Sequence, residues 1–188
     1  MRHMKGYILS LWSIVDPLYY RCTRLTYLSN STVDNIFRIR LTNYKGKPKV
    51  LTDGTIINKN DTLVKIHLHN VKLLAELKEV NSDVKKAIII YQKVKESLPG
   101  INQYIRNPPD RNKIQGIIGS SLLNRGSRKL GFDTFPLTNP LYKVFKYISF
   151  APICFIFGTN PFSKKHAIPS YLFMSKKKLE QMYRRKMG

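Results

Sequence analysis

Between residues 37 and 69 the hydrophobic pattern takes a period of two, which limits the folds open to this region. Apolar and basic side chains alternate from Phe37 to Leu41 and again from Val64 to His69. Such alternation is typical of strands that bury one face. Turn sequences at 45–48, 53–54 and 58–61 separate the runs, and Asp-Gly at 53–54 favours a tight hairpin. The pattern predicts a small antiparallel meander with one polar, basic face.

Helical spacing of apolar residues marks much of the remaining chain. The expected helices cover residues 7–15, 71–80, 83–98, 113–129, 139–157 and 176–186. Asn70 is an expected N-cap, Pro99-Gly100 should end one helix, and Ser175 should cap the last. Residues 132–137 read as extended. We predict an α+β fold, a small antiparallel β-meander packed with about five helices in a single domain over residues 1–162, followed by a basic helical extension over 163–188.

Composition narrows the class of protein. The 188 residues suit one domain, and 43% hydrophobic content is close to that of globular proteins. Cys22 and Cys154 have no paired spacing, so neither a disulfide framework nor structural zinc is expected, and a reducing compartment such as the cytoplasm fits. Apolar stretches at 7–15 and 148–158 are too short to span a bilayer. Whether they face the core or a membrane surface stays open.

Charge is the strongest compositional signal. The chain has 33 Lys and Arg against 11 Asp and Glu, a formal net charge of +22. A domain this basic repels itself, so the excess favours a partner that carries negative charge. Nucleic acid, anionic lipid and acidic glycan all qualify. The alternative is a codon bias toward lysine, with no functional meaning.

The polar face of the meander is the first candidate ligand site. Residues two apart share one face of a strand, so neighbouring strands would gather five cationic or titratable side chains suited to phosphate or carboxylate. They are Arg38, Arg40, Lys65, His67 and His69. A solvated sheet face is the alternative, and for His67 we favour a hydrogen bond to nearby backbone. A metal site would need a third ligand that the sequence does not supply, so neither a metal nor a cofactor is expected.

The basic C-terminal stretch is the second candidate, because cationic and apolar residues interleave there. This pattern suits an amphipathic helix on anionic lipid or contact with a nucleic-acid backbone. A solvated tail, or a helix packed by Leu179, Met182 and Tyr183, is the alternative. The cations are Lys176, Lys177, Lys178, Arg184, Arg185 and Lys186.

Catalytic signatures are not visible in the sequence. Asp53 and Asp61 could act as paired carboxylates, but both lie in turns, where aspartate is favoured for its hydrogen bonds to backbone. Residues 116–121 carry neither the P-loop lysine nor a nucleophile elbow. No catalytic residue is therefore assigned, and we lean against an enzyme.

Several short motifs in order resemble the YkoP-like proteins of spore-forming Bacillus relatives. They are LWSIVDPLYYR at 11–21, FR at 37–38, YKG at 44–46, DGT at 53–55, Asp61, IHL at 66–68 with Asn70, RG at 125–126, LGF at 130–132 and MS at 174–175. The resemblance implies a context of polysaccharide modification, because similar domains occur attached to polysaccharide deacetylases. This chain has Asn60 where the family pattern has Gly, and His69 where it has Asp. The second departure puts in doubt any activity that depends on the acid.

Charge and resemblance together predict a non-catalytic accessory domain that binds an anionic cell-envelope polymer or membrane surface. Nucleic-acid binding is the first alternative, although no known nucleic-acid-binding motif is visible. An enzyme that acts on glycan or lipid without a recognisable motif is the second. A protein partner also stays open, as does peripheral contact of a cytoplasmic protein with a membrane.

Overall fold

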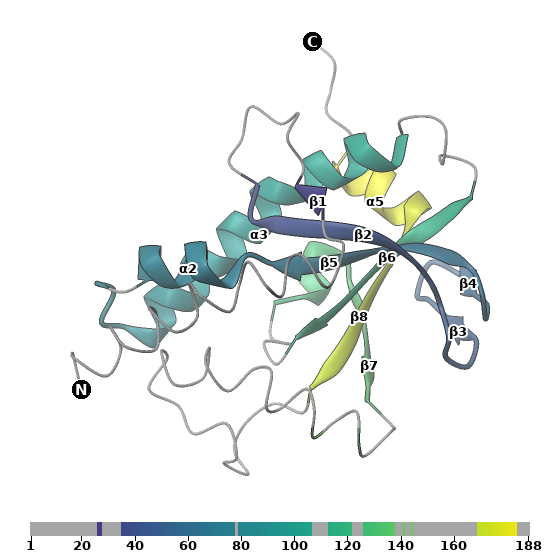
Figure 1. Cartoon of the computed structure of the whole chain (residues 1–188), viewed down its shortest axis with the longest axis horizontal. Helices are drawn as coiled ribbons and strands as arrows, with labels where there is room; N and C mark the ends of the chain where they lie inside the picture. Colours follow the sequence, from purple (N-terminus) through teal and green to yellow (C-terminus); the bar gives the residue numbers. More distant parts are fainter. Residues whose placement is uncertain are drawn as a thin grey trace.

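The computed structural model describes residues 26–27, 35–77, 79–106, 113–121, 126–137, 141, 144 and 169–183. Its elements appear in Figure 1. In chain order they are β1 (Thr26–Tyr27), β2 (Phe37–Asn43), β3 (Lys49–Val50), β4 (Ile56–Ile57), β5 (Thr62–Leu68), α2 (Asn70–Leu77), α3 (Asp83–Arg106), β6 (Ile114–Ser121), the 3-10 helix η1 (Arg128–Leu130), β7 (Asp133–Pro136), β8 (Ser170–Ser175) and α5 (Lys176–Tyr183).

A six-stranded mixed sheet forms the centre, in the order β1-β2-β5-β6-β8-β7, and β3 and β4 form a separate hairpin. β2 runs antiparallel to β5, whereas β5 and β6 are parallel. A parallel pair needs a long crossover, and α2 and α3 provide it, because both lie between β5 and β6 in the chain. β8 pairs antiparallel with both β6 and β7.

One face of the sheet is covered by helices and holds the larger hydrophobic core. Leu98, Ile101 and Ile105 of α3 and Leu179 of α5 are buried against it. The amphipathic α3 therefore gains its stability from packing, and it continues through Pro99 although proline removes a helical hydrogen bond. The strands contribute Phe37, Ile39, Val64, Ile66, Ile114, Ile117 and Met174 to this core.

The opposite face of the sheet carries the β3–β4 hairpin. Leu51 and Ile57 of the hairpin pack with Leu63, Ile118 and Phe173 of the sheet. Further along β5 the same face becomes basic, because Lys65 follows Leu63 at a spacing of two. This face is therefore divided between an apolar half under the hairpin and a polar half.

β6 shows why one helix prediction is wrong. The sequence predicted a helix over 113–129, but 114–121 is a strand whose central residues, 116–119, are buried on both faces. A strand of this kind shows no alternation of polar and apolar residues, and its isoleucines at 114, 117 and 118 imitate helical spacing. A Cβ at Gly116 would lie against the Met174 carbonyl oxygen, inside van der Waals contact, so glycine lets β8 approach β6 closely.

The predicted architecture, an α+β meander packed with about five helices, is wrong. The described residues form three α-helices and a mixed sheet whose central pair is parallel. The two alternating runs, the hairpin around Asp53-Gly54 and the extended segment near residue 133 are confirmed as β2, β5, β3–β4 and β7. The helix predicted over 83–98 runs on to Arg106. The helix predicted over 7–15 lies outside the described residues, as does most of 139–157.

Residues 170–183, assigned from the sequence to a basic extension, contribute β8 to the sheet interior and α5 to the core. Within the described ranges, no helix is both long enough and apolar enough to cross a bilayer.

Candidate functional site

Four side chains of β2 and β5 share one face of the sheet, and we call them the basic face: Arg38, Arg40, Lys65 and His67. The antiparallel register places Arg38 opposite His67 and Arg40 opposite Lys65. Directly opposed residues have Cβ atoms about 5 Å apart. The alternation read from the sequence therefore brings these four residues together on one face, and their role as a ligand site stays a prediction.

The basic face is partly withdrawn from water. Arg38 is only 4% exposed, and Arg40, Lys65 and His67 are half-buried. Burial, followed by the charge of Arg40, lowers the pKa of Lys65. Arg38, Arg40 and His67 each take part in further polar or electrostatic interactions. Like charges thus lie close together where solvent screens them less than at an open surface.

His69 joins the basic face to the start of α2. Its Nε2 lies 2.7 Å from a terminal guanidinium nitrogen of Arg38, and its Nδ1 lies 3.1 Å from the backbone nitrogen of Lys72. A neutral imidazole accepts at only one of its nitrogens, so the ring serves either Arg38 or the helix terminus in each tautomer.

His69 also stands at the N-cap of α2, because its carbonyl accepts from the amide of Leu73. The sequence placed this cap at Asn70, which is instead the first residue of the helix. His69 thus makes a contact with nearby backbone of the kind expected for His67, whose own backbone contact stays a prediction.

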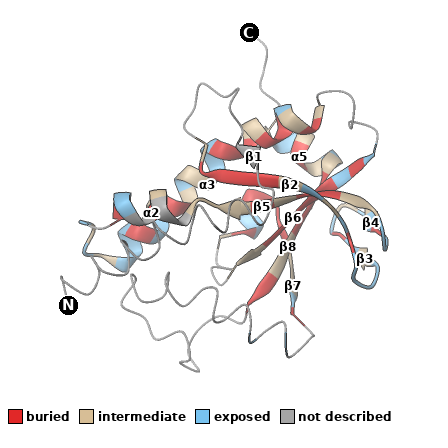
Figure 2. Cartoon of the chain, in the orientation of Figure 1, coloured by how far each residue is buried: buried red, intermediate tan, exposed pale blue. Residues whose placement is uncertain are grey.

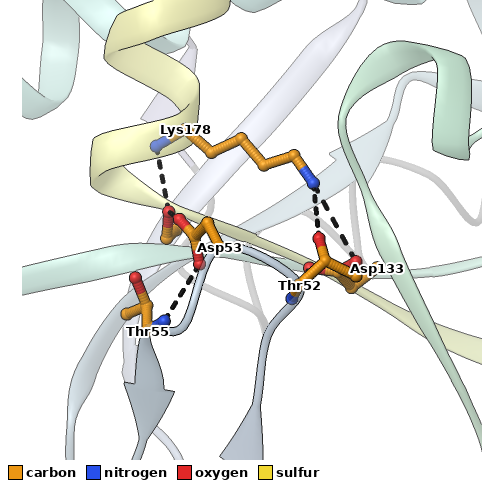
Figure 3. A network of polar contacts seen from close by, with 6 residues as sticks. Thr52, Asp53, Thr55, Asp133 and Lys178 are labelled. Atoms are coloured by element: carbon orange, nitrogen blue, oxygen red, sulfur yellow. Dashed lines mark hydrogen bonds and ion pairs between the residues drawn. The ribbon is translucent and has the colours of Figure 1, made fainter.

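A second polar cluster, the hairpin anchor, joins the turn of the β3–β4 hairpin to β7, β8 and α5 (Figure 3). Lys178 Nζ lies 2.8 Å from Thr52 Oγ1 and 3.9 Å from Asp133 Oδ1. The Thr52 amide donates to Asp133, and the Ser175 hydroxyl donates to Asp53. The hairpin anchor comprises Thr52, Asp53, Asp133, Ser175 and Lys178.

Ser175 and Asp53 each have a local structural task within this cluster. The amide of Lys178 donates to Ser175 Oγ at 2.9 Å, which confirms Ser175 as the N-cap of α5. Partial burial of Asp53 opposes its ionisation, but hydrogen bonds from Ser175 and Thr55 and the charge of Lys178 prevail and lower its pKa. The serine hydroxyl is thus engaged in capping and in hydrogen bonding to a carboxylate.

Asp53 and Asp61 both make the turn contacts expected from the sequence. Asp53 Oδ1 accepts from the Thr55 amide at 3.1 Å, and Asp61 Oδ2 accepts from the Asn58 amide at 2.6 Å. Asn60 adopts a positive φ of 71°, so asparagine here takes the left-handed conformation that glycine takes readily. The bond from Ser175 to Asp53 spans 122 residues and had no signal in the sequence.

The lysines of the predicted anionic-surface stretch lie in different surroundings. Lys177 is exposed, Lys176 is half-buried, and Lys178 belongs to the hairpin anchor. α5 packs inward through Leu179, and the Tyr183 hydroxyl donates to the Leu130 carbonyl at 3.0 Å. Burial, followed by nearby Tyr91, raises the pKa of Tyr183 to about 12. Arg184, Arg185 and Lys186 lie outside the described residues.

The arginine and lysine side chains of the basic face are hydrogen-bond donors. Arginine offers a planar fork that matches phosphate and carboxylate, and lysine adds a point charge. Across the described part of the chain, no group of three or more His, Cys, Asp or Glu side chains is arranged to hold a metal ion. The arrangement is suited to holding an anion.

Comparison with known proteins assigns this chain to a family. The model of the YkoP domain matches residues 5–183. The "Uncharacterized protein YkoP" of Bacillus subtilis (strain 168) is 49% identical over 185 residues, which cover 97% of this chain and all of the relative. No solved structure matches the chain. The match extends from the N-terminal motif through β8 and α5, and the chain belongs to the YkoP family.

Proposed function

We propose that this YkoP domain is a non-catalytic binding module whose basic face holds an anionic group of a cell-envelope polymer or membrane surface. The observation that carries the proposal is the register of β2 and β5, which sets Arg40 against Lys65 and Arg38 against His67. Two cations in direct opposition destabilise a sheet. An anion bound between Arg40 and Lys65 would offset the repulsion between the two cations.

The burial of the basic face supports recognition of a compact anionic group. A charge-assisted hydrogen bond strengthens as the surrounding dielectric falls. Because Lys65 and Arg40 are half-buried, a phosphate or carboxylate held there would be screened less than at an open surface. The polysaccharide-deacetylase context that the family resemblance implies is in keeping with an envelope partner.

The test compares two double variants of equal charge. Arg40→Gln/Lys65→Gln removes two cations from the basic face, whereas Lys85→Gln/Lys95→Gln removes two exposed cations from α3. Binding is measured by co-sedimentation with vesicles of phosphatidylcholine, with and without phosphatidylglycerol, and by retention on a soluble polyanionic glycan. We expect the basic-face variant to lose about ten-fold or more in affinity and the α3 variant to lose about two-fold at most.

An equal loss in the two variants would overturn the proposal, because it would assign binding to diffuse net charge. Duplex DNA serves as competitor at low and physiological salt. If DNA displaces the vesicles and the glycan, and its binding falls steeply with salt, the domain binds nucleic acid instead.

A further inference from the structure

The β3–β4 hairpin displays two large apolar side chains to solvent. Val50 and Ile56 are directly paired across the hairpin, and they are 66% and 52% exposed. Much of the hairpin is exposed at one end of the molecule (Figure 2). A paired, exposed valine and isoleucine form an apolar tip that the domain's own core leaves uncovered.

The hairpin holds this tip in a fixed orientation. Leu51 and Ile57, the chain neighbours of Val50 and Ile56, are buried in the core under the hairpin. The Leu51 amide donates to the Thr55 carbonyl at 2.9 Å, which closes the turn. The hairpin anchor ties the same turn to β7 and α5. Because alternate residues face opposite sides, burial of Leu51 and Ile57 keeps Val50 and Ile56 turned outward.

Exposed lysines flank the apolar tip in the chain. Lys45, Lys47 and Lys59 are exposed on the segments that enter and leave the hairpin. Tyr44 is buried, and its hydroxyl donates to the Lys47 carbonyl at 2.8 Å, which fixes the course of the lysine-bearing loop. Residues 44–60 contain four lysines and, before Asp61, the single acid Asp53, whose carboxylate is engaged by Ser175.

From this arrangement we propose that the hairpin inserts Val50 and Ile56 into the interface of an anionic bilayer, while the lysines of the flanking segments contact lipid phosphates. The inference rests on the proposed function, and among the partners it allows it selects the membrane. Apolar insertion and attraction between lysines and anionic headgroups add to each other at a membrane surface. A glycan or nucleic-acid backbone offers the lysines a partner but gives the apolar tip none.

The basic face and the apolar tip lie on the same side of the sheet. The hairpin packs on Leu63, and Lys65 follows on the same face of β5. One lipid surface can therefore meet both. A headgroup phosphate at the basic face and acyl chains at the tip would be contacts with a single bilayer.

The chain offers a matched control for the tip. Val84 and Ile88 of α3 are also a valine and an isoleucine, and they are 69% and 50% exposed. We compare Val50→Ser/Ile56→Ser with Val84→Ser/Ile88→Ser, and each with Arg40→Gln/Lys65→Gln, in the full chain. The probes are phosphatidylcholine vesicles that contain about one third phosphatidylglycerol, and soluble glycerol phosphate. Thermal unfolding verifies that each variant is folded.

We expect Val50→Ser/Ile56→Ser to lose about ten-fold in vesicle affinity at physiological salt and to bind glycerol phosphate as the parent does. The α3 control should bind vesicles within two-fold of the parent. If the tip and control variants bind alike while the basic-face variant fails, the insertion is overturned and the proposed function stands. If the basic-face variant binds both probes as the parent does, the proposed function itself is overturned. Binding to the soluble probe without vesicle binding would also overturn the insertion.

Discussion

Lys65 and Lys178 lie in contrasting surroundings. Lys178 is placed between a threonine hydroxyl and the carboxylate of Asp133, so its charge helps to hold the hairpin to the core. Lys65 lies opposite Arg40, and burial together with that cation lowers its pKa. The first lysine is stabilised by the fold, and the second is opposed by it. A positive charge that is unfavourable in the folded state costs stability, so we expect it to be kept for binding.

Gly116→Ala tests the close packing of β6 against β8. Gly116→Ala should cost about 3 kcal/mol, because the added methyl group meets the Met174 carbonyl and forces β8 away from β6. The free energy of unfolding in urea measures the loss. Gly54, where an added Cβ meets nothing within 4 Å, is the control. Gly54→Ala should cost only about 1 kcal/mol, because the left-handed backbone conformation alone opposes the added methyl group. Equal losses would place the close approach of β6 and β8 in doubt.

Asp133 tests the hairpin anchor directly. Asp133→Ala leaves the Thr52 amide and the Lys178 ammonium without their carboxylate and should cost about 2 kcal/mol. Urea unfolding against Glu96→Ala, which removes an exposed acid from α3, checks this value. A loss no larger than that of the control would show that the anchor contributes little. Anion binding by the folded variant should be retained.

Lys65→Met tests whether the positive charge of Lys65 destabilises the folded state. Lys65→Met removes a half-buried cation from beside Arg40, so the free energy of unfolding should stay constant or rise. Solvent screening holds the gain below about 1 kcal/mol. Chemical denaturation at neutral pH measures it. A clear loss of stability would show that the ammonium is stabilised by the fold, which would remove the contrast with Lys178.

Asp53 gives the smallest effect, and it depends on pH. The folded state lowers its pKa below the ordinary value of 3.8, so the stabilisation is present above that pH and is lost as the pH falls through the folded value. Asp53→Asn lacks this titration. The difference in stability between parent and variant should therefore be largest near neutral pH and shrink below about pH 4. A difference that stays constant with pH would contradict the hydrogen-bonded carboxylate.

The sequence predicted those strands in which buried apolar residues alternate with polar residues on the opposite face. β2 and β5 alternate cleanly, and Asp-Gly marks the hairpin, so both were predictable, as was the shared face of Arg40 and Lys65. β6 was not, because burial on both faces removes the alternation. The bond between Ser175 and Asp53 was not predictable either, since it joins segments brought together only by the pairing of β8 with β6.

Pro99 shows a different limit. Its ring and missing amide predict a helix end, but tertiary packing of Leu98 and Ile101 carries α3 past it. Local signals failed where long-range burial outweighed them.

Binding by Lys65→Met and Lys178→Met tests the central claim most directly. Each variant removes one positive charge, so net charge is matched. Affinity for soluble glycerol phosphate, which reports on the basic face and not on the apolar tip, should fall about five-fold or more for Lys65→Met and stay within two-fold for Lys178→Met when measured by calorimetry at physiological salt. Equal affinities in the two variants would contradict the assignment of anion binding to the basic face.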